Sequence, residues 1–221
     1  MKYAVQIATL IFALPALMHG QRVSDDDTTF KVYPDHEGHS YFPEGRESYY
    51  TRYLAAMKEP SLFRQLPDGI ESIYRLTILP SFSDRISIRI SKKGESYEMR
   101  SIQLKCGYNH EPEKIVRDET RILKQDVSGP LIGLLSRKEL WVEFTDLEEA
   151  VMNSVRDGVT YIFEESTKNG YKMLDPHTPA AVVQYQETDQ DFSDKDFRIY
   201  DKIVERIMRE SGLPVEANLR L

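Results

Sequence analysis

The chain has 221 residues, of which 40% are hydrophobic and 29% are charged, and its formal net charge is −7. Such an acidic chain repels phosphate backbones, so nucleic acid is excluded as an expected partner. The single cysteine, Cys106, excludes a disulfide within the chain, and a domain near 180 residues buries enough surface to fold without one.

The N-terminus has the order of a secretory signal: Lys2, an apolar run from Tyr3 to Leu14, and then Pro15. The run is shorter than the roughly 20 apolar residues that span a bilayer, so we expect no permanent membrane anchor. We therefore predict a signal peptide over residues 1–20, with the cleavage site open by several residues, and a periplasmic or secreted protein. Bacterial export is favoured because the chain contains no Asn-x-Ser/Thr acceptor and no pair of cysteines.

Residues 21–45 carry Pro, Gly, Asp and His without hydrophobic period and are predicted to form an extended or disordered arm. A single α+β domain is expected over 46–213, followed by a flexible tail over 214–221. Its first helix is indicated by apolar residues spaced three and four apart, and Pro60 stops it; these residues are Tyr50, Tyr53, Leu54 and Met57.

Three strands are predicted next, over Ser72–Leu79, Arg85–Ile90 and Tyr97–Leu104. A turn signal at Lys92-Lys93-Gly94 makes them an antiparallel meander, to which Lys114–Leu123 adds a fourth strand. The following region is helical, with Pro130 in a first helical turn, a capping box from Thr145 to Glu148, and Trp141 between them as a core anchor.

A C-terminal hairpin is predicted from Val159–Phe163 and Tyr171–Leu174, turning through Asn169-Gly170. The last helix has its apolar face over Phe197–Met208, with Ser193 as a plausible cap and Gly212 and Pro214 at its end. The expected fold is therefore α+β: an antiparallel meander sheet with a C-terminal hairpin, packed by a long C-terminal amphipathic helix and shorter helices.

Few residues point to catalysis or to a metal. His36 and His39 stand among carboxylates but lack the i, i+4 spacing of a zinc helix, so they are weak metal candidates, and we expect no cofactor. His110 and His177 lie in loops without a nucleophile in a recognisable turn. Cys106 follows an alternating strand and is interpreted as a small buried hydrophobe.

The hairpin carries a motif made of Asp157-Gly158, Tyr161, Glu164, Gly170-Tyr171 and Pro179. This motif resembles a pattern of uncharacterised bacterial exported proteins, in which an aromatic-x-x-Glu strand leads into a Gly-Tyr strand and then a Pro. The resemblance covers Ser72 to Leu213 and implies no particular activity.

The function that this sequence favours is non-enzymatic binding of another protein in the cell envelope, for example as an inhibitor or immunity protein. The alternatives are an envelope hydrolase or metal-dependent enzyme that uses Glu164 or the His36/His39 cluster, and an envelope assembly subunit. For binding, the candidate residues are Trp141, Tyr161, Glu164 and Tyr171. The structural alternative is that Tyr161 and Tyr171 pack across strands.

Overall fold

A computed structural model describes residues 40–42, 50–63, 66–107, 109–188 and 195–213, all within the unit Val32–Leu221. The elements are α1 (Thr51–Ala56), β1 (Ser72–Pro80), β2 (Arg85–Lys93), β3 (Ser96–Cys106), β4 (Pro112–Leu123), α2 (Gln125–Leu135), the 3₁₀ helix η1 (Lys138–Trp141), α3 (Asp146–Ser154), β5 (Val159–Thr167), β6 (Gly170–Leu174), α4 (Pro179–Thr188) and α5 (Arg198–Ser211). None of the described helices is both long enough and apolar enough to cross a membrane.

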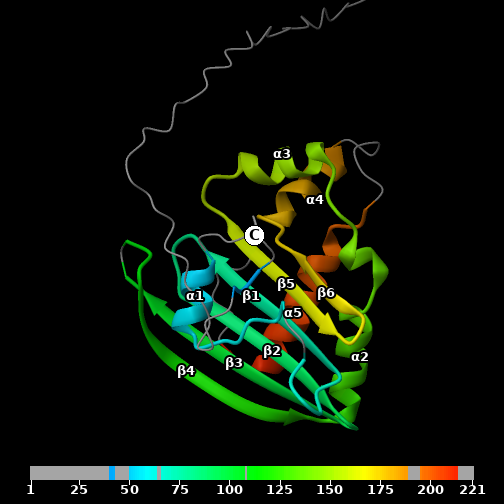
Figure 1. The fold of residues 1–221 in the computed structure, drawn as a ribbon. Helices are drawn as coiled ribbons and strands as arrows, with labels where there is room; N and C mark the ends of the chain where they lie inside the picture. Colours follow the sequence, from blue (N-terminus) through cyan, green and yellow to red (C-terminus); the bar gives the residue numbers. More distant parts are fainter. Residues whose placement is uncertain (1–39, 43–49, 64–65, 108, 189–194, 214–221) are drawn as a thin grey trace, which may run out of the picture. The chain divides into compact units, whose positions relative to one another are not determined.

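The strands form one sheet in the order β4-β3-β2-β1-β5-β6, and every neighbouring pair is antiparallel (Figure 1). The first four strands are a meander, and after α2, η1 and α3 the chain returns to place β5 beside β1. The predicted α+β class, the meander with its fourth strand, and the C-terminal hairpin are confirmed. The second strand was predictable because Ile86, Ile88 and Ile90 alternate with polar residues at the period of two that a pleated sheet imposes.

The hairpin turn differs from its prediction. Thr167 pairs with Gly170, so the turn residues are Lys168 and Asn169, one position earlier than the predicted Asn169-Gly170 turn. Asn169 has no positive φ, whereas Gly170 has φ 129° at the start of β6. Glycine therefore serves the strand entry, and the two-residue turn does not need the left-handed backbone that favours Asn-Gly.

One face of the sheet is covered by α2, α3, α4 and α5, which bury its apolar residues in the larger core (Figure 1). The alternating isoleucines Ile86, Ile88 and Ile90 of β2 point into this core. The predicted C-terminal helix is confirmed as α5, and it ends at Gly212 in the left-handed region, with φ 68°. Its predicted cap, Ser193, lies outside the described residues.

Two helices depart from their prediction. The predicted first-turn position of Pro130 is wrong, because α2 begins at Gln125 and Pro130 lies inside it. The earlier start lets Val127 pack against the core. Helix α4 was not predicted: it starts with Pro179, a favourable first position, but its apolar residues are consecutive and lack a helical period. The capping box from Thr145 to Glu148 is confirmed at the start of α3.

The second face carries α1 and a smaller apolar core. Tyr53, Leu54 and Met57 of the predicted first helix are buried here. Tyr41 and Phe42, which fall within the predicted arm, are also buried in this core. The core occupies only part of this face, because the positions beside it on the central strands are polar.

Candidate functional site

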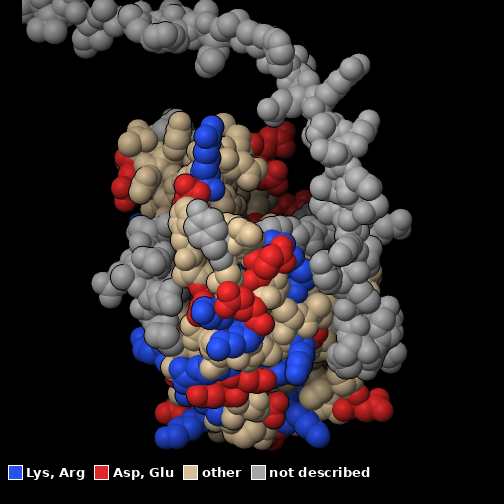
Figure 2. All heavy atoms as spheres, turned by 90° about the vertical axis from the view of Figure 1, so that its left-hand side faces the viewer, with Lys and Arg blue, Asp and Glu red and all other residues tan. Residues whose placement is uncertain are grey.

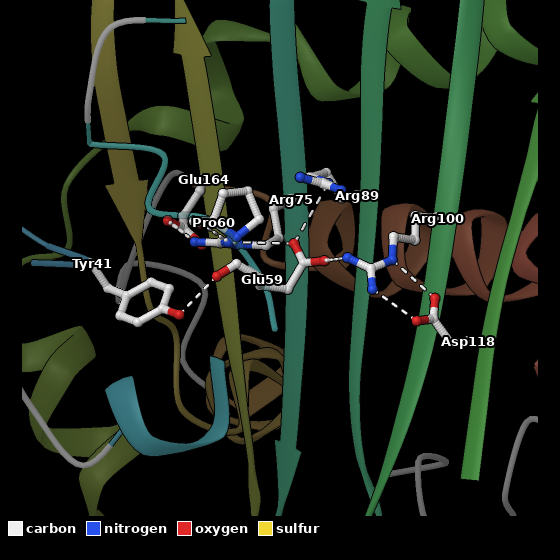
Figure 3. A network of polar contacts seen from close by, with 8 residues as sticks. All are labelled: Tyr41, Glu59, Pro60, Arg75, Arg89, Arg100, Asp118 and Glu164. Atoms are coloured by element: carbon white, nitrogen blue, oxygen red, sulfur yellow. Dashed lines mark hydrogen bonds and ion pairs between the residues drawn. The ribbon is translucent and has the colours of Figure 1, made fainter. Parts of the chain in front are cut away.

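A row of charged residues runs straight across the second face of the sheet. Glu164 of β5 pairs in register with Arg75 of β1, Arg75 pairs with Arg89 of β2, and Arg89 pairs with Arg100 of β3. Like charges on directly opposed strand positions repel, so three neighbouring arginines need counter-charges. The carboxylates of Glu59, Glu164 and Asp118 supply them (Figure 3).

Glu59 lies over the middle of this row. It comes from the segment after α1 and is 1% exposed, and its carboxylate is 3.4 Å from Arg75, 3.6 Å from Arg89 and 3.2 Å from Arg100 (Figure 3). The hydroxyl of Tyr41 donates to the Glu59 carbonyl at 2.7 Å. The row therefore holds the Glu59 segment against the sheet.

Glu164 forms the innermost pair. Both of its oxygens accept hydrogen bonds from Arg75, at 2.6 and 2.7 Å, and one also accepts from the Tyr171 hydroxyl at 2.9 Å. Burial, the largest single effect, lowers the pKa of Arg75, but the charge and hydrogen bonds of Glu164 together with the charge of Glu59 outweigh it, so this pKa lies above its ordinary value. Burial, reinforced by Glu164, also raises the pKa of Tyr171. A buried carboxylate that accepts three hydrogen bonds in this way has a structural role, since it holds its donors in place.

The opposite end of the row reaches solvent. Asp118 of β4 accepts two hydrogen bonds from Arg100, which hold the pKa of Asp118 below its ordinary value. Burial lowers the pKa of Arg89, and the charges of Arg75 and Arg100 add to this effect against the attraction of Glu59. Because positive and negative groups balance along the row, it is a poor receptor for a highly charged ligand.

On the other side of the sheet, a hollow of roughly 600 Å³ lies between η1 and the start of α5. Apolar and charged side chains line it together: Leu134, Arg137, Glu139, Val142, Glu143, Thr145, Glu148, Lys195, Asp196, Ile199 and Lys202. Val142 is 52% exposed, which is high for an apolar side chain in a concave site. Apolar walls with a few polar groups are typical of binding sites.

Lys195 has the most unusual surroundings in this hollow. Its ammonium nitrogen donates to the Val142 carbonyl at 2.6 Å and lies 4.1 Å from the centre of the Phe144 ring, with the rings of Phe197 and Tyr200 at 5.3 Å each. Burial lowers the pKa of Lys195 to about 8, against the opposing charge of Glu148. This amine is therefore partly neutral under mildly alkaline conditions.

The four predicted binding residues do not form one site, although two of them lie together. Glu164 and Tyr171 are bonded to each other on the second face, whereas Tyr161 is 1% exposed within the larger core, where burial raises its pKa to about 12. Trp141 belongs to η1, packs against the larger core and donates to the Leu135 carbonyl at 2.9 Å.

The other predicted candidates are scattered. His36 and His39 lie outside the described residues. His177 is held by Thr160 and by the Val155 carbonyl, both at 3.0 Å. Cys106 is half-buried, and burial raises the pKa of its thiol. Within the described ranges, no group of three or more His, Cys, Asp or Glu side chains is arranged to hold a metal ion.

The surface around β4, next to the exposed end of the row, carries charges of both signs. Figure 2 shows the side of the molecule on which β4 lies, where basic and acidic side chains alternate. Strand β4 itself contributes three basic and three acidic residues: Lys114, Arg117, Arg121, Glu113, Asp118 and Glu119. Adjacent opposite charges cancel at a distance, so this face does not steer a partner of one sign.

The residues of these two sites that sequence reasoning missed include Glu59, Arg75, Arg89, Arg100, Asp118 and Lys195. The alignment of Arg89 with Arg100 could have been found, because the predicted turn at Lys92-Lys93-Gly94 joins their two strands, whereas no predicted turn aligned Arg75 with Arg89. Glu59 and Lys195 carry no local pattern, since their environments depend on tertiary packing.

No protein-family model, curated protein or solved structure matches this chain.

Proposed function

We propose that this protein is exported and acts by binding another protein of the cell envelope, without catalysis, through the hollow between η1 and α5. The observation that supports this proposal is the hollow itself, with its apolar walls and the exposed Val142. A partner can insert an apolar side chain there, and the removal of that side chain from water favours binding.

The rim of the hollow gives the partner polar contacts. Arg137 and Lys202 can meet carboxylates, whereas Glu139, Glu143 and Asp196 can meet basic groups. Such mixed charges favour specificity over raw affinity, because a wrongly placed charge on the partner is repelled. This chemistry fits a protein surface better than a small ligand of one charge.

The charged row on the other face supports binding only indirectly. It holds the Glu59 segment on the sheet. The oxygens of Glu164, the residue predicted for the catalytic alternative, accept hydrogen bonds from Arg75 and Tyr171. A general acid or base needs a carboxyl that can exchange a proton with substrate. Glu164 is 1% exposed, so no substrate reaches it without rearrangement of the fold.

The binding part is tested by affinity capture from the cell envelope with two matched variants. Val142→Asp places a charge in the hollow, and Ile122→Asp places the same charge on β4, where Ile122 is 64% exposed. We expect a partner that wild type and Ile122→Asp retain and Val142→Asp loses. A partner that Val142→Asp retains as well as wild type does would contradict the site.

The export part is tested separately, by N-terminal sequencing of the protein recovered from cells. We expect mature material that lacks residues 1 to about 20, because a basic end, an apolar run and a helix breaker precede that point. Intact Met1 in the soluble cytoplasmic fraction would refute export while leaving the binding site testable.

A further inference from the structure

Arg85, the first residue of β2, has a buried guanidinium. It is 3% exposed, and it forms no ion pair with any residue that the structure describes. The other arginines on this face, Arg75, Arg89 and Arg100, all pair with Glu59. Buried charges are ordinarily paired, so Arg85 is an exception on this face.

The contacts of Arg85 leave part of its donor capacity unused. One terminal nitrogen donates to the Ser83 carbonyl, the other lies 3.2 Å from Nδ1 of His110, and the guanidinium stands over the Tyr53 ring at 5.3 Å. Its buried Nε has no hydrogen-bond partner among the residues that the structure describes. A guanidinium carries five N–H donors, and described acceptors take two of them.

His110 adds a second donor. Arginine can only donate, so Nδ1 of His110 accepts from Arg85 and the neutral ring carries its hydrogen on Nε2. The left-handed backbone of His110, with φ 61°, belongs to the turn between β3 and β4. This turn and the turn between β1 and β2 lie at the same end of the antiparallel sheet, near α1 (Figure 1).

A cavity of roughly 430 Å³ opens where these two turns meet. Ser83, Asp84, Arg85, Cys106 and His110 are among its lining residues. Asp84 accepts a hydrogen bond from Gln103 at 2.8 Å and does not neutralise Arg85. The cavity thus combines the buried cation of Arg85 with the carboxylate of Asp84, which weakens the binding of anions. Its lining residues belong to other elements than those that line the hollow.

We propose that this cavity binds the carboxylate group of a small organic acid through Arg85. The planar guanidinium matches a carboxylate with two parallel hydrogen bonds. A singly charged carboxylate suits the cavity better than phosphate does, because the repulsion from Asp84 grows with the charge of the ligand.

Cys106 reports occupancy in the unmodified chain, because it lines the cavity and is the chain's single cysteine. Its alkylation by iodoacetamide is followed in acetate, in phosphate and in chloride at equal ionic strength. At a tenfold excess of acetate over its Kd we expect alkylation to slow roughly tenfold, since only the unoccupied fraction reacts. Unchanged alkylation in acetate would overturn the proposal, and stronger protection by phosphate would overturn the choice of a carboxylate.

Three variants locate the effect. Arg85→Met should abolish protection, Arg89→Met on the same strand and face should keep it, and Asp84→Asn should strengthen it about threefold or more by removing the repulsion. Acetate should also raise Tm by roughly 3 to 6 °C at the same excess, except in Arg85→Met. Equal responses of Arg85→Met and Arg89→Met would contradict a site at Arg85. If Arg85→Met does not fold, the wild type and Asp84→Asn decide the question.

Discussion

Four arginines on one face of the sheet differ in how their charge is compensated. Arg75 has a buried bidentate partner, Arg89 and Arg100 share Glu59, and Arg85 has no carboxylate partner among the described residues. Removing water from a charge costs several kcal/mol, so each arrangement has a different consequence when a partner is removed. The ion pair fixes the position of the Arg75 side chain, whereas the guanidinium of Arg85 keeps N–H groups that can bind a ligand.

The first prediction concerns the innermost pair. Glu164→Gln keeps the shape of the side chain but leaves the fully buried Arg75 without its main counter-charge, so we expect a loss of about 3 to 5 kcal/mol in the free energy of unfolding. Tyr171→Phe removes one hydrogen bond to the same carboxylate and should cost about 1 kcal/mol. Urea unfolding of both variants measures this difference, and equal losses would show that the ion pair is not the main interaction.

The second prediction concerns the amine in the hollow. Because burial lowers the pKa of Lys195 to about 8, its acylation by a small reagent should rise with pH to a midpoint near 8, followed by mass spectrometry of the labelled peptide. In urea, where the burial is lost, the midpoint should return toward the ordinary lysine value of 10.5. The same acylation midpoint in folded and unfolded protein would mean that burial does not lower the pKa of Lys195.

At the scale of elements, periodicity decided which parts of the fold could be predicted. Strand β2 alternates apolar and polar residues at a period of two, and α5 repeats its apolar residues at a period of 3.6; the structure has both within a few residues of their expected bounds. The start of α2 was missed because the pattern around Pro130 does not reveal that Val127 packs against the core. The consecutive apolar residues of α4 gave no period to recognise.

The third prediction tests how α5 is held on the sheet. Ile203 is fully buried on its inner face, so Ile203→Asp should cost about 3 to 5 kcal/mol, because the new carboxylate loses its hydration without a partner. Lys202, whose side chain is 63% exposed, should tolerate Ala within about 0.5 kcal/mol. Thermal unfolding of both variants measures the contrast, and similar shifts in Tm would contradict this orientation of the helix.

At the scale of the whole molecule, the sheet separates two kinds of polar environment. Its second face holds a compensated charged row and the Arg85 cavity, whereas the helical face carries the apolar core and the hollow. The candidate residues chosen from the sequence lie on both faces. Tyr161 and Glu164, for example, are three positions apart on β5, so the pleat points their side chains to opposite faces. Sequence reasoning therefore located the elements better than it located the sites.

Site-specific photo-crosslinking in cells tests most directly whether the hollow binds a partner. A benzophenone amino acid is introduced at Val142 in the hollow and, as a matched control, at the exposed Ile122 on β4. We expect a discrete adduct with one envelope protein from position 142 and none from position 122. Adducts from position 122 alone, or none from position 142 under conditions where the protein is active in the cell, would contradict it.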